Sequence, residues 1–102
     1  MRVVAAALCG AAGAAGAQDA TAGRAKAQAC TVCHGALGLS TTPDAPSLAG
    51  QPAIYLAAQL RAYRSGLRKH EVMAVMAKTL SDDDIRNLSA WFSSIRVEAS
   101  AP

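Results

Sequence analysis

Cys30-Thr31-Val32-Cys33-His34 is the stretch that decides the fold of this 102-residue chain. Two cysteines three positions apart lie on one side of a helical turn, and a histidine follows the second directly. This pattern is typical of covalent haem attachment, in which two thiols add to the vinyl groups on one haem edge and the histidine binds iron. The sequence therefore predicts one c-type haem, bonded to Cys30 and Cys33, with His34 as an axial ligand.

Three other uses of the motif compete with haem attachment. Thiol–disulfide oxidoreductases also carry two cysteines at this spacing, but normally in a β-α-β setting, and the chain has no strand pattern. A zinc site needs four ligands, and His70 is the one histidine outside the motif. A structural disulfide around so few residues would add little stability. The oxidoreductase remains the alternative from a different functional class.

An electron-carrying haem usually has a second axial ligand, and three residues after the motif are candidates: Met73, Met76 and His70. A thioether ligand would raise the reduction potential relative to a second imidazole. Methionines near an apolar stretch are more often packing residues than ligands, so the residues alone leave this choice open.

The first 17 residues have the pattern of a secretory signal peptide. Arg2 supplies a positive charge, and residues 3–17 form an uncharged alanine-rich run ending in the small-residue pattern Ala15-Gly16-Ala17. The run is too short and too weakly apolar for a membrane anchor. We expect export to the periplasm and cleavage after residue 17, with Cys9 discarded in the leader.

Removing the leader would leave 85 residues, a length at which domains often rely on a metal, a disulfide or a cofactor. The aromatic residues of this part are only Tyr55, Tyr63, Trp91 and Phe92. A large flat cofactor would supply the missing core volume. The net charge of +3, or +2 without Arg2, is too small for the concentrated basic face of a nucleic-acid-binding protein.

The periodicity predicts an all-α domain over residues 18–96. Helices are expected from about residue 22 to 30, from 52 to 64 with Gly66 as the stop, and from Ser81, whose cap is completed by Asp84. Residues 35–50 are rich in glycine and proline and predict a long loop, and residues 97–102 a disordered tail. The predicted apolar stripes, each on one helix face, are Leu56, Leu60, Tyr63 and Leu67, and then Ile85, Leu88, Phe92 and Ile95.

The chain resembles class I cytochromes c, most closely the short single-haem bacterial kind that is similar to one half of the periplasmic dihaem cytochromes. The likeness covers nearly all of residues 18–96. It is carried by Gly23, Lys26, Cys30-x-x-Cys33-His34-Gly35, Pro46-x-Leu48-Ala49-Gly50-Gln51, Tyr55-Leu56-x-x-Gln59-Leu60, Gly66, Met73, Leu80-Ser81-Asp82 and Asp84-Ile85. The resemblance implies the class I cytochrome c fold, with three main helices, a short helix and a long loop around one covalent haem.

The resemblance also implies roles for individual residues. In proteins of that kind the ligand methionine lies eight residues before the serine of the Leu-Ser-Asp cap, which implies Met73, with Met76 in reserve. Pro46 matches the proline whose carbonyl accepts a hydrogen bond from the axial histidine. The first and last helices are expected to cross where Gly23 meets Trp91-Phe92.

These expectations favour a single-electron carrier that is not an enzyme, because catalysis at haem needs an open iron position. Its partners would be redox proteins, free or membrane-bound, with no small-molecule substrate, and the carrier would be a monomer. The alternative is a cytochrome subunit that stays bound to a periplasmic dehydrogenase or reductase. Four basic residues either steer docking toward an acidic partner or form a solvated helix face: Arg61, Arg64, Arg68 and Lys69.

Overall fold

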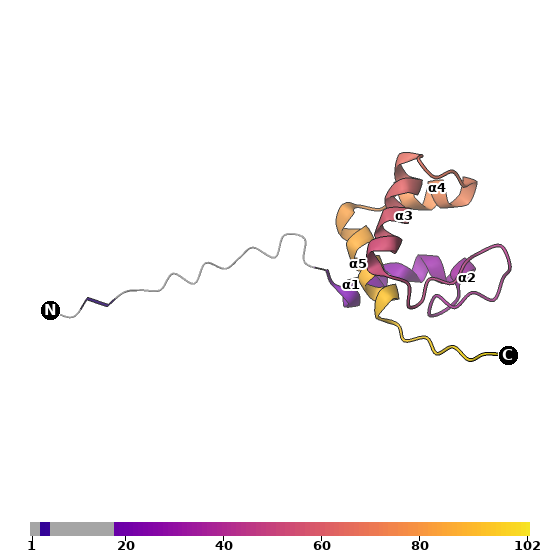
Figure 1. Ribbon diagram of the computed structural model, residues 1–102. Helices are drawn as coiled ribbons and strands as arrows, with labels where there is room; N and C mark the ends of the chain where they lie inside the picture. The colour runs from indigo at the N-terminus through magenta and orange to yellow at the C-terminus, as the bar shows by residue number, and fades with distance from the viewer. Residues whose placement is uncertain (1–2, 5–17) are drawn as a thin grey trace.

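The computed structural model describes residues 3–4 and 18–102. Every regular element within them is helical, which confirms the all-α class. The elements are α1 (Ala20–Lys26), a 3-10 turn (Ala27–Cys30), α2 (Thr31–His34), α3 (Ala53–Ser65), α4 (Glu71–Lys78) and α5 (Asp82–Ser94) (Figure 1). None of the described helices is long and apolar enough to cross a membrane. The signal peptide predicted over residues 1–17 lies, apart from residues 3–4, outside the described residues and stays a prediction.

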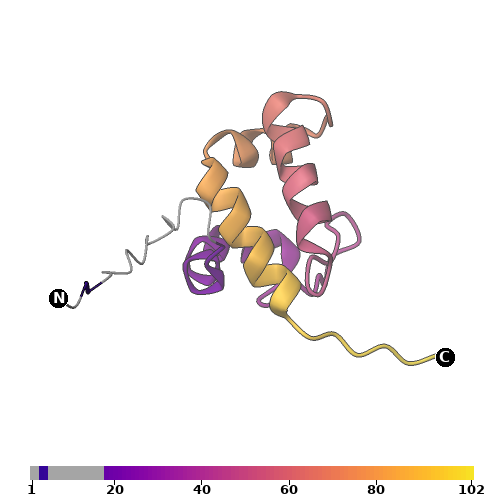
Figure 2. The ribbon, with the colours of Figure 1, turned by 60° about the vertical axis from the view of Figure 1, so that its left-hand side comes forward.

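The helices pack in pairs: α1 against α5, and α3 against both α4 and α5. The first and last helices therefore contact each other, as the resemblance implied. Figures 1 and 2 place α4 near the C-terminal end of α3 and the α2 segment near its N-terminal end. The haem-attachment motif and the methionine-bearing helix thus lie at opposite ends of α3.

Helix α1 begins at Ala20, two residues earlier than predicted, because Asp19 caps it. The Asp19 side chain accepts a hydrogen bond from the backbone N–H of Ala22 at 3.0 Å. The backbone N–H of Asp19 in turn donates to Oδ1 of Asn87, also at 3.0 Å. The start of α1 is therefore tied both to its own first turn and to α5.

Gly23 lies at the point where α1 meets α5. A Cβ atom added there would overlap the carbonyl oxygen of Asn87 and lie 2.9 Å from Cβ of Trp91. The expected contact is therefore confirmed for Trp91, but Phe92 lies against the loop instead. A Cβ added at Gly38 would be 2.8 Å from Cδ1 of Phe92. The two aromatic residues are neighbours in sequence, and a helix turns consecutive side chains onto different faces.

Helix α3 ends at Ser65, and the next residue, Gly66, adopts the left-handed conformation at φ +84°. Its buried residues are Leu56 and Ala57. The prediction was wrong for Leu67, whose side chain is 86% exposed. The left-handed turn at Gly66 takes the chain off the helix axis, so the four-residue spacing no longer keeps Leu67 on the buried face.

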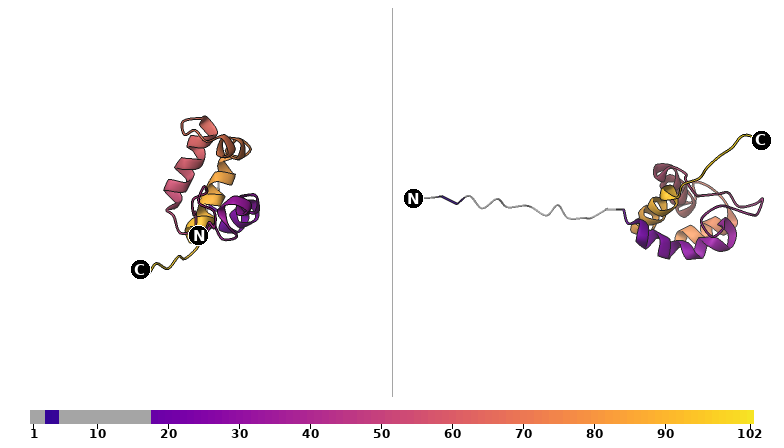
Figure 3. Two further views of the ribbon diagram at one scale, coloured as in Figure 1. Left: turned by 90° about the vertical axis from the view of Figure 1, so that its right-hand side faces the viewer. Right: turned by 90° about the horizontal axis from the view of Figure 1, so that it is seen from below.

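Residues 35–50 form the predicted loop, and backbone hydrogen bonds hold it. The carbonyl of Gly38 accepts from the N–H groups of Leu48 at 2.7 Å and Ala49 at 3.1 Å, so the loop closes on itself. The N–H of Gly50 donates to the carbonyl of Phe92 at 2.8 Å and joins the loop to α5. Beyond α5 the chain has no regular structure, and Figure 3 shows this C-terminal segment leaving the helical body. The disordered tail stays a prediction.

Helix α5 has the capping box expected from the sequence. The Ser81 hydroxyl accepts from the Asp84 N–H, and the Asp84 carboxylate accepts from the Ser81 N–H, both at 3.0 Å. The Ser81 backbone donor lowers the pKa of Asp84. The Arg64 guanidinium, which donates to the Asp82 carboxylate at 2.6 Å, lowers the pKa of Asp82. Folding thus favours the ionised form of both carboxyls.

Acid should therefore destabilise the protein partly through this helix start. The stabilisation from a lowered folded-state pKa is present above the unfolded value of about 4 and is lost as pH falls through the folded value. Asp84→Asn should make the unfolding free energy fall less steeply below about pH 4. Urea unfolding of the haem-loaded protein between pH 7 and pH 2, followed by circular dichroism, measures this. Asp83→Asn, outside the capping box, is the control, and equal flattening in that variant would contradict the prediction.

Candidate functional site

The haem-attachment motif lies on a nearly continuous helical path from α1 through the 3-10 turn into α2. Cys30 ends the 3-10 turn and is half-buried, whereas Cys33 lies in α2 and is exposed. His34 is the last residue of α2 and is 8% exposed. Gly35 then adopts φ +89°, and a Cβ there would overlap the carbonyl oxygen of Leu39. Only glycine lets the chain turn this sharply directly after the histidine.

The His34 ring is held by one hydrogen bond. Its Nδ1–H donates to the carbonyl oxygen of Pro46 at 2.7 Å, the contact that the resemblance implied. A carbonyl can only accept, so the ring proton lies on Nδ1 and Nε2 keeps its lone pair. No group in the described chain hydrogen-bonds to Nε2. A buried imidazole oriented through one nitrogen and free at the other has the form of a metal-binding histidine.

The chemistry of the described residues fits a covalent haem. Half of the buried apolar residues in the described chain are alanines. The buried set is Ala27, Ala49, Leu56, Ala57, Ala77, Ile85, Leu88 and Phe92. Many large apolar side chains are instead half or fully exposed, among them Leu37, Leu39, Ile54, Tyr55, Val72 and Val75. A large apolar group would supply buried surface that these side chains do not create among themselves. The two cysteines and His34 Nε2 are the donors that covalent haem requires, so the residues fit the group.

The two cysteines do not have the features of an exchange enzyme. Burial raises the pKa of the Cys30 thiol, so this thiol is neutral near pH 7. Thiol–disulfide oxidoreductases depend on the opposite shift, a thiolate stabilised by its surroundings. The motif also lies in a helical segment that is followed by a loop, with no strand in the described residues. As for zinc, no three His, Cys, Asp or Glu side chains converge anywhere in the described part of the chain.

The three candidates for the second axial ligand all lie on α4 or at its start. Met73 is the third residue of the helix and half-buried, and Met76 is 36% exposed, one turn later. His70 is the N-cap: its Nδ1 accepts a hydrogen bond from the Met73 backbone N–H at 3.2 Å. This capping role is not among the predictions from the sequence. Two features of the sequence are consistent with an N-cap at His70: its side chain can accept a hydrogen bond, and the acidic Glu71 follows directly in the first turn of the helix.

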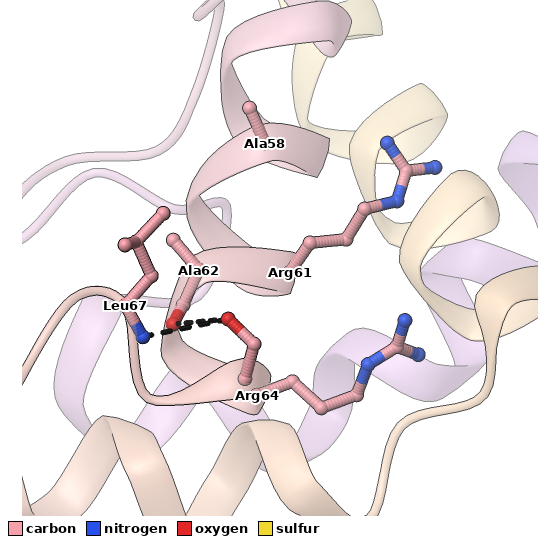
Figure 4. A pocket seen from close by; sticks show the side chains of 6 residues that line it. Ala58, Arg61, Ala62, Arg64 and Leu67 are labelled. Carbon is pink, nitrogen blue, oxygen red and sulfur yellow. Dashed lines mark hydrogen bonds between the residues drawn. The ribbon is translucent and has the colours of Figure 1, made fainter.

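Two of the four basic residues considered for docking, Arg64 and Arg68, are engaged within the molecule. Arg64 donates to the Leu80 carbonyl at 3.1 Å and to Asp82. Arg68 donates to Oε1 of Gln59 at 2.7 Å. Figure 4 shows Arg61 and Arg64 extending to the same side of α3 beside an open groove of about 530 Å³. These contacts favour a structural role for Arg64 and Arg68 over free docking charges.

Comparison with known proteins identifies the family. Residues 20–96 match the family described as Cytochrome c. The chain is 44% identical over 79 residues to cytochrome c-554(548) of Halomonas halodenitrificans, which covers 74% of this chain and 95% of that protein. The crystal structure of reduced recombinant cytochrome c4 from Pseudomonas stutzeri superposes with a TM-score of 0.74 at 39% identity, covering 78% of this chain and 47% of that one.

A structure of thiosulfate dehydrogenase from Marichromatium purpuratum superposes with a TM-score of 0.74 at 38% identity, covering 78% of this chain and 20% of that one. The chain therefore spans nearly the whole of one relative and about half of the cytochrome c4 chain. This confirms the predicted likeness to one half of a longer cytochrome. The chain belongs to the cytochrome c family and is an electron-transfer protein with a covalently bound c-type haem.

Proposed function

We infer that the protein is a diffusible periplasmic single-electron carrier whose haem iron is bound by His34 and Met73. The observation that carries this proposal is the buried His34 at the attachment motif, oriented by Pro46 through Nδ1 and free at Nε2. When bound, the haem supplies an iron that accepts and releases one electron at a time. The export signal predicted over residues 1–17 supports the periplasmic assignment.

The protein side chains would hold the group in one geometry throughout the electron transfer. Cys30 and Cys33 would anchor it covalently, and the Pro46 carbonyl would keep the His34 ring from turning and raise its basicity. Met73 would fill the remaining axial position from α4. With both positions taken by protein atoms no small molecule would reach the iron, so we propose no catalytic role.

The alternative is a cytochrome that stays bound to a periplasmic dehydrogenase or reductase. The likeness to one fifth of a thiosulfate dehydrogenase chain favours this possibility, because a domain of this fold can be part of a larger redox protein. A stable partner would cover exposed apolar side chains, and Val32 and Ile54 are 88% and 87% exposed.

Size-exclusion chromatography of a native periplasmic extract separates the two proposals. A diffusible carrier should elute at about the monomer size, below the 10.4 kDa of the full chain if the leader has been removed. The elution is followed by haem absorbance, and the intact mass of the eluted protein tests cleavage after residue 17. Purified protein added to buffer is the control for the monomer position. Elution of the haem with a larger protein at all salt concentrations would favour the bound subunit.

A further inference from the structure

A series of side-chain contacts joins the end of α3 to the start of α4. Gln59 and Tyr63 lie one turn apart on α3, and Arg68 donates to Gln59 at 2.7 Å. The Arg68 guanidinium also lies over the Tyr63 ring, 4.8 Å from its centroid. The His70 ring meets Tyr63 edge-on, with 6.3 Å between centroids and 74° between planes. His70 is thereby held against the longer helix from one side.

His70 also makes two hydrogen bonds to the first turn of α4. Its Nδ1 accepts from the N–H of Met73 at 3.2 Å, and its carbonyl accepts from the N–H of Ala74 at 2.9 Å. The backbone of His70 is extended, with φ −161° and ψ 126°, as an N-cap requires. One side chain therefore links Tyr63 of α3 to the peptide nitrogen of Met73.

Helix α4 has little else to fix its start. It has only eight residues, and isolated helices of that length are unstable in water. Ala77, near its C-terminal end, is its one fully buried residue. Val72 and Val75 are 54% and 65% exposed. The first turn, which carries Met73, therefore depends on its cap more than on packing within the chain.

We propose that His70 is a positioning residue for the axial methionine: its ring, held against Tyr63, caps α4 at the backbone N–H of Met73 and keeps that side chain in place. This inference rests on the proposed axial role of Met73. Neutral Nδ1 is the accepting atom, so the effect is one of geometry and hydrogen bonding. An alanine at this position would leave the Met73 N–H without its partner and release the first turn from α3.

Competition with imidazole in solution measures how firmly the methionine is held. Imidazole binds ferric haem when the native sixth ligand leaves, so its apparent affinity rises as the methionine is held less firmly. His70→Ala should raise that affinity about fivefold, the usual effect of losing a helix cap. His70→Asn should restore most of the wild-type affinity, because the asparagine oxygen is also a good cap. The ferric charge-transfer absorption from sulfur to iron, measured without imidazole, gives a second readout.

Ser81→Ala is the matched control, since it removes the N-cap of α5, a helix without a ligand candidate. It should lower the free energy of unfolding by a similar amount but change the imidazole affinity by less than about twofold. An unchanged affinity in His70→Ala, an equal rise in Ser81→Ala, or no recovery in His70→Asn would overturn the proposal. A failure of the axial assignment itself is seen separately, because either Met73→Ala would retain the charge-transfer absorption or the wild-type protein would lack it.

Discussion

Met73→Ala should abolish the sulfur-to-ferric-iron charge-transfer absorption and lower the reduction potential on the order of 0.2 V, part of the roughly 0.8 V over which axial ligands tune haem. A thioether favours the reduced iron, so its removal favours the oxidised state. Met73 lies in the first turn of α4, half-buried, with its backbone N–H held by His70. Absorption spectra of the ferric protein and protein-film voltammetry measure the two effects.

Met76→Ala is the control, because Met76 lies on the same short helix, one turn later and 36% exposed. It should retain the absorption band and change the potential little. If the two variants exchange behaviour, Met76 is the ligand. If both single variants retain the band, either methionine can replace the other as the ligand. If the wild-type protein itself lacks the band, the sixth ligand is neither methionine, and His70→Ala becomes the next variant to measure.

Gly23→Ala should have the largest effect on stability, lowering the free energy of unfolding by about 3 kcal/mol, the upper part of the usual range for overpacking. In a helix interior, alanine is favoured over glycine by about 1 kcal/mol. The expected loss of stability is therefore opposite in sign to the effect of helix propensity alone. The reason is the crossing of α1 and α5, where a Cβ atom would overlap the carbonyl of Asn87. The end of a flexible side chain can move away from an added atom, but the backbone of α5 cannot. The added Cβ atom therefore forces α1 and α5 apart.

Gly66→Ala separates this steric effect from a conformational one. At Gly66 a Cβ would meet no atom within 4 Å, but φ is +84°. The cost there should be about 1 kcal/mol, that of a left-handed alanine. Urea unfolding of the two haem-loaded variants, followed by circular dichroism, gives both values. A loss in Gly23→Ala no greater than in Gly66→Ala would show that the helix crossing relaxes.

Much of the site was predictable because its signals are local. The attachment motif spans five consecutive residues, and the capping box joins Ser81 to a residue three positions later. Within one helical turn, spacing alone determines which atoms can meet. Gly66 likewise marked the end of α3, because few other residues adopt the left-handed conformation easily. The Pro46 contact, by contrast, came from the family resemblance and not from spacing.

The chain by itself determined the all-α class and the covalent haem, and it predicted the residues that attach the haem, since these depend on residue type and short spacings. Only the tertiary structure decided that His70 caps α4 against Tyr63, and that Arg64 holds the start of α5. It also placed Phe92 against Gly38 and left Leu67 exposed. Such contacts join residues from separate elements, and where they meet depends on the path of the intervening loops, which no periodicity along the chain encodes.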